Sequence, residues 1–159
     1  MLITDTDHVC GICGDMAWVW KTFTKGHNPI LMDGYDDAAI GLGAAGYDPS
    51  DPKWEAIRRN MGYSRSYALR MDLAAAEPHG DLVESEMTGY ALAKPGSQYL
   101  VFVPSASTVR VNLSAVGGSL NVEWFNPSTG IATQAGTVAG GVSHTFTVPF
   151  SGPAVLFLY

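Results

Sequence analysis

The sequence predicts an α+β chain of two parts, in which alternating strands and helices are followed by an antiparallel β-sandwich. Hydrophobic residues make up 47% of the 159 residues and charged residues 15%, a composition that supports a buried core. From Met87 to the end, only Lys94, Arg110 and Glu123 are charged. A turn-forming segment at 77–81 precedes this change. We therefore expect one unit over residues 1–80 and a second over 81–159.

The first part begins with a predicted strand and a predicted helix. Residues 2–4 are a short apolar run, and Asp15 is a suitable N-cap for a helix that starts at Met16. Gly26 is well placed to end that helix. The helical face follows from apolar side chains at i, i+3, i+4 and i+7, namely Met16, Val19, Trp20 and Phe23.

A second strand and helix follow. Residues 29–32 resemble a buried strand, and the glycines and prolines of 36–50 predict a long loop. Asp51 and Pro52 are typical of a helix start, and the apolar positions that follow extend the predicted helix to Met71. Short strands alternating with helices favour βα units in a parallel sheet.

The second part has the pattern of an antiparallel sandwich. Its apolar runs are short, are separated by turn-forming Gly, Pro and Asn clusters, and often alternate with polar residues. For example, Val109, Val111 and Leu113 are predicted to point inward, and Arg110 and Asn112 outward. The seven predicted strands are 90–92, 99–103, 109–113, 120–125, 131–134, 144–148 and 154–158.

Charge and hydropathy exclude two classes of partner. The formal net charge is -6, so no cationic surface is expected for nucleic acid. No apolar run approaches the roughly 20 residues that cross a bilayer, so no membrane span is expected. No export signal follows Met1, which indicates either a cytoplasmic protein or a start that is not the natural one.

Several segments resemble apiosidase-like glycoside hydrolases, which are (β/α)8 barrels. The last two βα units of these barrels are similar to ITDTDH at 3–8, GDMAWVWK at 14–21 and GHNPILMD at 26–33. Their final barrel helix is similar to WEAIRR at 54–59 with MGY at 61–63. The small β-sandwich that closes many of them, usually labelled collagen-binding, is similar to TGYALA at 88–93, PGSQYLV at 95–101 and VEWFNPSTG at 122–130.

The resemblance implies a partial (β/α)8 barrel over residues 1–80 and a sandwich over 81–159. It also implies that the complete protein is a bacterial enzyme that hydrolyses a plant or algal polysaccharide. Such a barrel needs about 250 residues, so the missing units would hold the general acid/base and most sugar subsites. We expect the chain alone to be inactive and to need the missing N-terminal barrel portion or self-association. The complete enzyme would bind a carbohydrate substrate and be secreted or periplasmic. The alternative is a non-catalytic module that binds glycan or a collagen-like matrix.

Asp5 and Asp7 are the candidate catalytic residues. They follow a predicted strand, and barrel enzymes project catalytic groups from strand ends. Retaining glycosidases use one carboxylate as nucleophile and a second as acid/base. The resemblance places the nucleophile at the end of the seventh strand, which makes one of this pair the candidate. The alternative is that both side chains accept hydrogen bonds from loop amides.

Three further residues are candidates for substrate binding. His8 could orient a carboxylate or contact a sugar hydroxyl, and the alternative is a structural histidine. Asp33 occupies the equivalent strand end one unit later and could bind a sugar hydroxyl. Tyr35 could offer an aromatic face to the sugar, whereas the alternative packs it beneath a loop.

The remaining candidates favour structural roles. Cys10 and Cys13 have the spacing of half a zinc site, but no second pair completes four ligands, so we expect inert thiols and neither metal nor cofactor. Trp20 lies on the apolar face of the predicted helix and is expected in the core, and Trp18 could pack against a neighbouring helix. The aromatic residues of the sandwich, Tyr99, Trp124 and Phe125, could form a binding surface, although strand alternation places one of each adjacent pair inward.

Overall fold

The computed structural model describes residues 2–5, 14–31, 52–84 and 89–159. Strand β1 (Leu2–Asp5) and strand β2 (His27–Ile30) pair in parallel, with Leu2 opposite His27 and Asp5 opposite Ile30. Helix α2 (Met16–Thr24) lies between them in the sequence. The predicted parallel βα arrangement is confirmed for this pair, and β2 begins at His27 instead of residue 29. The (β/α)8 barrel itself stays an expectation.

The ends of α2 are those that the sequence predicts. Asp15 caps the helix by accepting a 2.6 Å hydrogen bond from the backbone nitrogen of Trp18. At the other end, Gly26 has a φ of 77°, a left-handed conformation that costs glycine little, and its nitrogen donates to the Phe23 carbonyl. Local chemistry therefore fixes both boundaries.

Helix α4 (Pro52–Ala68) is shorter than predicted. It ends at Ala68 because the chain tightens there, and the nitrogen of Arg70 donates to the carbonyl of Tyr67, three residues back. Met71, the predicted last residue, is nevertheless buried. Its apolar character therefore reflects packing beyond the helix end.

The second part forms two antiparallel sheets. Each of the seven predicted strands is found, and two strands of two residues, β3 and β4, are additional. The segment 77–81, predicted as turn-forming, also contains a short strand, because Glu77 pairs with Ala93 and the nitrogen of His79 donates to the Ala91 carbonyl. A short 3-10 turn, η1 (Gly80–Leu82), joins β3 to β4.

The larger sheet has six strands in the order β3-β5-β6-β11-β8-β9, and the smaller has three in the order β10-β7-β4. The bounds of the six-stranded sheet are β3 (Glu77–Pro78), β5 (Tyr90–Lys94), β6 (Gln98–Val103), β11 (Ala154–Leu158), β8 (Ser119–Asn126) and β9 (Ile131–Ala139). Those of the three-stranded sheet are β10 (Ser143–Thr147), β7 (Thr108–Asn112) and β4 (Val83–Glu84).

One hydrophobic core lies between the two sheets. The predicted inward residues Val109, Val111 and Leu113 are each at most 2% exposed, whereas Arg110 points outward. They pack with aliphatic side chains of the larger sheet and with Trp124. This is the core of the predicted β-sandwich.

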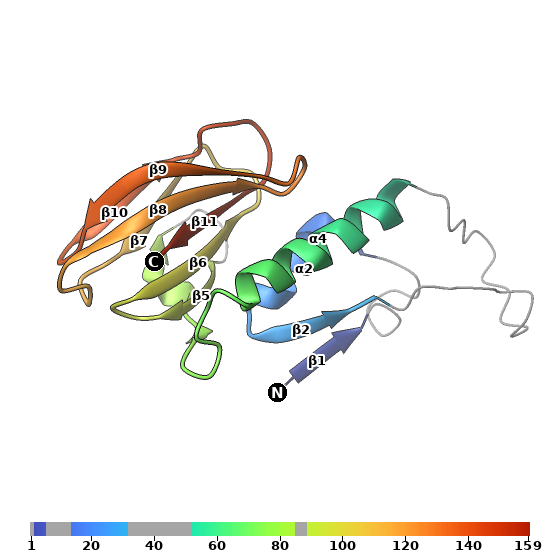
Figure 1. The fold of residues 1–159 in the computed structure, drawn as a ribbon, viewed down its shortest axis with the longest axis horizontal. Coiled ribbons are helices and arrows are strands. Elements are labelled where there is room, and N and C mark those ends of the chain that lie inside the picture. Colours follow the sequence, from blue (N-terminus) through green and yellow to red (C-terminus); the bar gives the residue numbers. More distant parts are fainter. Residues whose placement is uncertain (1, 6–13, 32–51, 85–88) are drawn as a thin grey trace, which may run out of the picture.

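A second core lies on the opposite face of the six-stranded sheet, where α2 and α4 cover it (Figure 1). Alternate residues of β6, β8 and β11 supply this face, so β11 is buried along its whole length. Trp20 of α2 stands at the centre, with ring centroids 5.7 to 6.5 Å from three other aromatic rings, Tyr67, Phe102 and Phe125. The sandwich and the helices on it therefore form three layers, namely the small sheet, the large sheet and the helices, and the β1-β2 pair is a separate sheet beside the helices (Figure 1).

Candidate functional site

The predicted catalytic position lies at the carboxyl end of the parallel pair. Asp5 is the last residue of β1 and stands opposite Ile30, the last residue of β2. The two strands therefore end at the same edge of their sheet, as the sequence predicts. Asp7, His8, Asp33 and Tyr35, and likewise Cys10 and Cys13, lie outside the described residues.

The tryptophans of α2 are core residues. Trp20 is 0% exposed in the core between the helices and the large sheet. Trp18 packs beside Trp54 and Ile57 of α4, so the predicted contact with a neighbouring helix is confirmed.

The aromatic residues of the sandwich do not form an exposed surface. Trp124 points into the core between the sheets, and its neighbour Phe125 points into the core beneath the helices. Together with Tyr99, both residues are at most 4% exposed. The idea of an aromatic binding surface at these positions is therefore wrong, because both faces of the large sheet are covered.

A buried carboxylate that sequence reasoning did not single out lies between α4 and β8. Glu123 is 4% exposed, and four hydrogen bonds satisfy its two oxygens. Oε1 accepts from the Tyr67 hydroxyl at 2.7 Å and from Arg70 Nη1 at 2.8 Å. Oε2 accepts from Arg70 Nη2 at 2.9 Å and from Gln134 Nε2 at 2.7 Å. This bidentate geometry is the strong form of an arginine–carboxylate pair.

The electrostatics of this cluster keep Glu123 charged. Burial alone would raise the pKa of Glu123, but the hydrogen bonds from Arg70 and Tyr67 outweigh it and hold the pKa below the ordinary value. Burial, and then the hydrogen bond to Glu123, raise the pKa of Tyr67, which stays neutral. The hydrogen bond to Glu123 also raises the pKa of Arg70.

The Glu123 cluster has a structural role. A catalytic carboxylate must reach its substrate, whereas the oxygens of Glu123 are occupied by partners from α4, the turn after it, and β9. Its signal in the sequence was an acidic residue between Val122 and Trp124, inside an otherwise apolar strand. The partner, Arg70, is 53 residues away, and no spacing rule connects the two.

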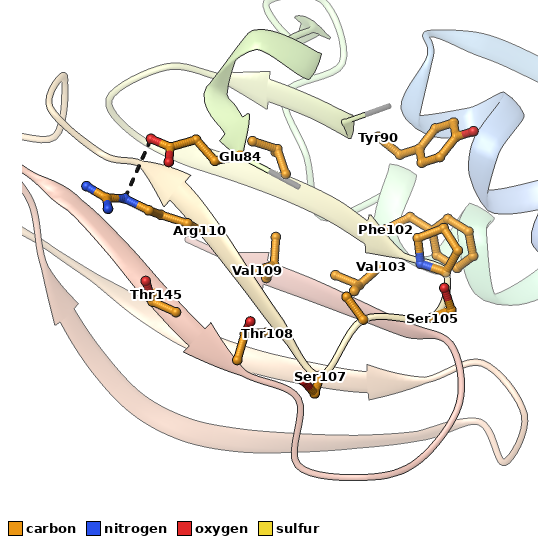
Figure 2. A pocket seen from close by; sticks show the side chains of 13 residues that line it. Glu84, Tyr90, Phe102, Val103, Ser105, Ser107, Thr108, Val109, Arg110 and Thr145 are labelled. Carbon is orange, nitrogen blue, oxygen red and sulfur yellow. Dashed lines mark ion pairs between the residues drawn. The ribbon is translucent and has the colours of Figure 1, made fainter. Parts of the chain in front are cut away.

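An open groove of about 540 Å³ lies at one end of the sandwich (Figure 2). Its floor includes Val103 and Val109, and hydroxyl groups of Ser107, Thr108 and Thr145 lie along it. At one end, Arg110 Nε lies 3.6 Å from Glu84 Oε1, and both side chains are more than half exposed. The guanidinium of Arg110, the carboxylate of Glu84 and several hydroxyl groups thus lie beside an aliphatic floor.

The groove has the chemistry of a binding site. Glycoside hydrolysis needs two carboxyl groups across the scissile bond. Glu84 is the single carboxylate among the described residues that line the groove.

Within the part of the chain that the structure describes, no group of three His, Cys, Asp or Glu side chains could hold a metal ion. No helix of the described segments is long and apolar enough to cross a membrane.

The sequence of the sandwich matches a family model. Residues 81–155 match the family described as "Putative collagen-binding domain of a collagenase". The matched residues span β4 to the start of β11, together with most of η1. No curated protein matches the sequence.

Eight solved chains are structurally similar to this protein. One, named "Glycoside hydrolase", has a TM-score of 0.58 at 15% identity, over 83% of this chain and 32% of its own. Another is a glycoside hydrolase family 5 protein from Bacteroides vulgatus ATCC 8482, with a TM-score of 0.58 at 18% identity, over 69% of this chain and 25% of its own. This chain thus spans about a third or a quarter of those proteins. The likeness shows that this chain shares the fold of part of those proteins.

Proposed function

We propose that this chain is the C-terminal part of an apiosidase-like glycoside hydrolase. In this proposal, β1, α2, β2 and α4 are the last two βα units of a (β/α)8 barrel, and the sandwich packs on their helices. Asp5 or Asp7 supplies a carboxylate to the complete active site, and His8, Asp33 and Tyr35 contact the sugar. The substrate is a glycosidic bond of a plant or algal polysaccharide, and the complete enzyme is exported.

The observation that carries this proposal is the exposure of two apolar side chains on one face of the parallel strand pair, within the part of the chain that the structure describes. Ile3 is 61% exposed and Ile30 is 39% exposed. Their register places both side chains on the same face, because Ile30 pairs with Asp5, two residues after Ile3. In a (β/α)8 barrel the helices lie outside and the inward face of each strand is packed by the other strands. Within the described segments these two isoleucines are left exposed, as two strands of such a barrel would leave them without the others.

The missing partner follows from the same geometry. A barrel closes only when its remaining strands pair with both outer edges of this sheet and bury its inner face. The proposed partner is therefore the N-terminal barrel portion, either in the same polypeptide or as a second polypeptide. The self-associated alternative places a second copy on the same face.

The experiment is an activity assay on the complete enzyme, assembled from the in-frame sequence upstream of Met1. We expect one of the two variants, Asp5→Asn or Asp7→Asn, to lower kcat at least about a hundredfold, because it removes the reacting carboxylate. Asp15→Asn is the matched control, since Asp15 is the N-cap of α2 and asparagine also caps helices. Full activity in both Asp5→Asn and Asp7→Asn would contradict the catalytic assignment.

The isolated chain tests the partner assignment. Ile3→Asp should leave its stability almost unchanged, because the side chain is exposed, but should weaken assembly with the N-terminal portion. Measurable hydrolysis by the isolated chain would contradict the proposal that it is inactive alone.

The sandwich groove favours one alternative, a non-catalytic module that binds glycan or a collagen-like matrix. The match of residues 81–155 to a collagen-binding family supports it. In that case the isolated chain would bind oligosaccharides or triple-helical collagen peptides in a calorimetric titration. Arg110→Met would abolish binding to the groove. Arg59→Met, which removes an exposed ion pair on α4, would leave binding unchanged. If neither the oligosaccharides nor the collagen peptides gave a binding signal in the titration, this alternative would be contradicted.

A further inference from the structure

We infer that the helices and the six-stranded sheet are held together by the Arg70–Glu123 ion pair and unfold together. The helical layer and the sandwich then form one cooperative unit. The sandwich is then not a module that moves on a tether. This inference does not depend on whether the chain contributes to catalysis.

The ion pair is buried on the Glu123 side and packed by aromatic rings on the Arg70 side, where 37% of the arginine side chain stays exposed. The guanidinium carbon of Arg70 lies 4.9, 4.7 and 5.3 Å from the ring centroids of Tyr67, Phe157 and Tyr159. Its two hydrogen bonds to Glu123 run across the interface from the end of α4 to β8. Arginine is therefore held by π contacts and by a bidentate acceptor together.

The chain that follows α4 is attached to the same sheet at further points. The side chain of Gln98, in β6, donates to the Arg70 carbonyl at 3.0 Å and accepts from the Asp72 nitrogen at 2.8 Å. Lys94, in β5, forms a 2.8 Å ion pair with Asp72. Three strands of the sheet, β5, β6 and β8, thus bind Arg70 and Asp72.

Opening this interface is costly because of what it leaves behind. Glu123 lies on the same sheet face as two phenylalanines. Phe125 is two residues further along β8, and Phe157 is the residue of β11 that pairs with Glu123. If α4 moved away, an apolar sheet face would carry a charge without its main counterion. A partly detached helix would therefore expose both aromatic area and an unpaired carboxylate, and this favours all-or-none opening.

Hydrogen exchange of the full chain, followed by mass spectrometry, tests the inference. Arg70→Lys keeps the charge but loses the bidentate geometry. We expect its protection factors to fall at least about tenfold, and by the same factor, in peptides of α4 and of β8. Glu123→Gln is the second variant, and it should produce the same paired loss.

The matched control is Arg59→Met, which removes an exposed arginine–glutamate pair from the same helix. It should leave protection in both regions within twofold of the wild type. Loss of protection in α4 alone, with β8 unchanged, would overturn the inference, because the layers would then open independently. Unchanged protection in both regions of both Arg70→Lys and Glu123→Gln would overturn it as well.

Discussion

The indole nitrogen of Trp20 donates a 2.8 Å hydrogen bond to Oδ1 of Asn60, and both side chains are buried. The amide nitrogen of Asn60 then donates to the Ala56 carbonyl at 2.9 Å and to the Pro127 carbonyl at 3.2 Å. A single amide thus joins α2, α4 and the turn between β8 and β9. These bonds lie at the middle of α4, whereas Arg70 follows the end of the helix.

Replacing Asn60 should destabilise the molecule without altering its surface. Asn60→Ala leaves the indole nitrogen of Trp20 and the Pro127 carbonyl without a partner in a buried site. We expect the free energy of unfolding to fall by about 2 to 3 kcal/mol, measured by urea titration. Ser66→Ala, on the exposed side of the same helix, should change it by less than about 0.5 kcal/mol. A cost below 1 kcal/mol for Asn60→Ala would mean that water replaces the lost bonds.

The Glu123 cluster predicts how stability depends on pH. The folded pKa of Glu123 lies below its ordinary value of 4.5, so its contribution is present above about pH 4.5 and is lost as the pH falls through the folded pKa. Glu123→Gln should therefore lower the free energy of unfolding by about 3 kcal/mol at pH 7. The difference between the variant and the wild type should shrink as the pH falls below 4.5.

Urea titrations of both proteins between pH 7 and pH 3 measure this difference. Asp72 also loses a stabilising charge in that range, because the hydrogen bond and charge of Lys94 lower its pKa. It does so in both proteins, and so it cancels in the comparison. A difference that stays constant with pH would show that Glu123 acts through shape alone.

The sequence was most informative where the chemistry is local. The α2 boundaries followed from Asp15 and Gly26, and the strands of the sandwich followed from apolar alternation and turn residues. The parallel pairing of β1 and β2 followed from the alternation of strands and helices. Each of these signals lies within one or two elements, where short-range sterics and hydrogen bonds decide the structure.

The packing of the helices on the sandwich was not predicted, although β11 carried a signal for it. The AVLFL run of 154–158 is apolar at every position, which indicates a strand that is buried on both faces. What the sequence could not indicate is which element covers the second face. The Arg70–Glu123 and Trp20–Asn60 contacts join residues 53 and 40 positions apart, and only the tertiary fold brings them together.

The N-cap of α2 offers a test of a locally determined feature. Asp15→Ala removes the acceptor of the 2.6 Å hydrogen bond from the Trp18 nitrogen. We expect a loss of about 1 kcal/mol in the free energy of unfolding, whereas Asp15→Asn should recover most of it, because asparagine also caps helices. Equal losses in the two variants would indicate that charge, and not the cap, is responsible.

Gly130, in the turn between β8 and β9, should tolerate no side chain. Its φ is 74°, and a Cβ at this position would collide with the hydroxyl and ring of Tyr63 on α4. Gly130→Ala should therefore cost more than the roughly 1 to 2 kcal/mol of left-handed strain, because the turn must also move away from α4. Gly117→Ala is the matched control, since its Cβ would meet nothing within 4 Å and no positive φ is required there.

A double-mutant cycle separates the two contributions of Gly130. In a Tyr63→Ala background the collision is removed and only the backbone strain remains, so Gly130→Ala should cost less there than in the wild type. Urea titration of the four proteins gives the coupling energy. A coupling near zero would mean that the turn does not press against α4, and that the contact between the helical layer and this end of the sandwich is looser than the Tyr63–Gly130 approach indicates.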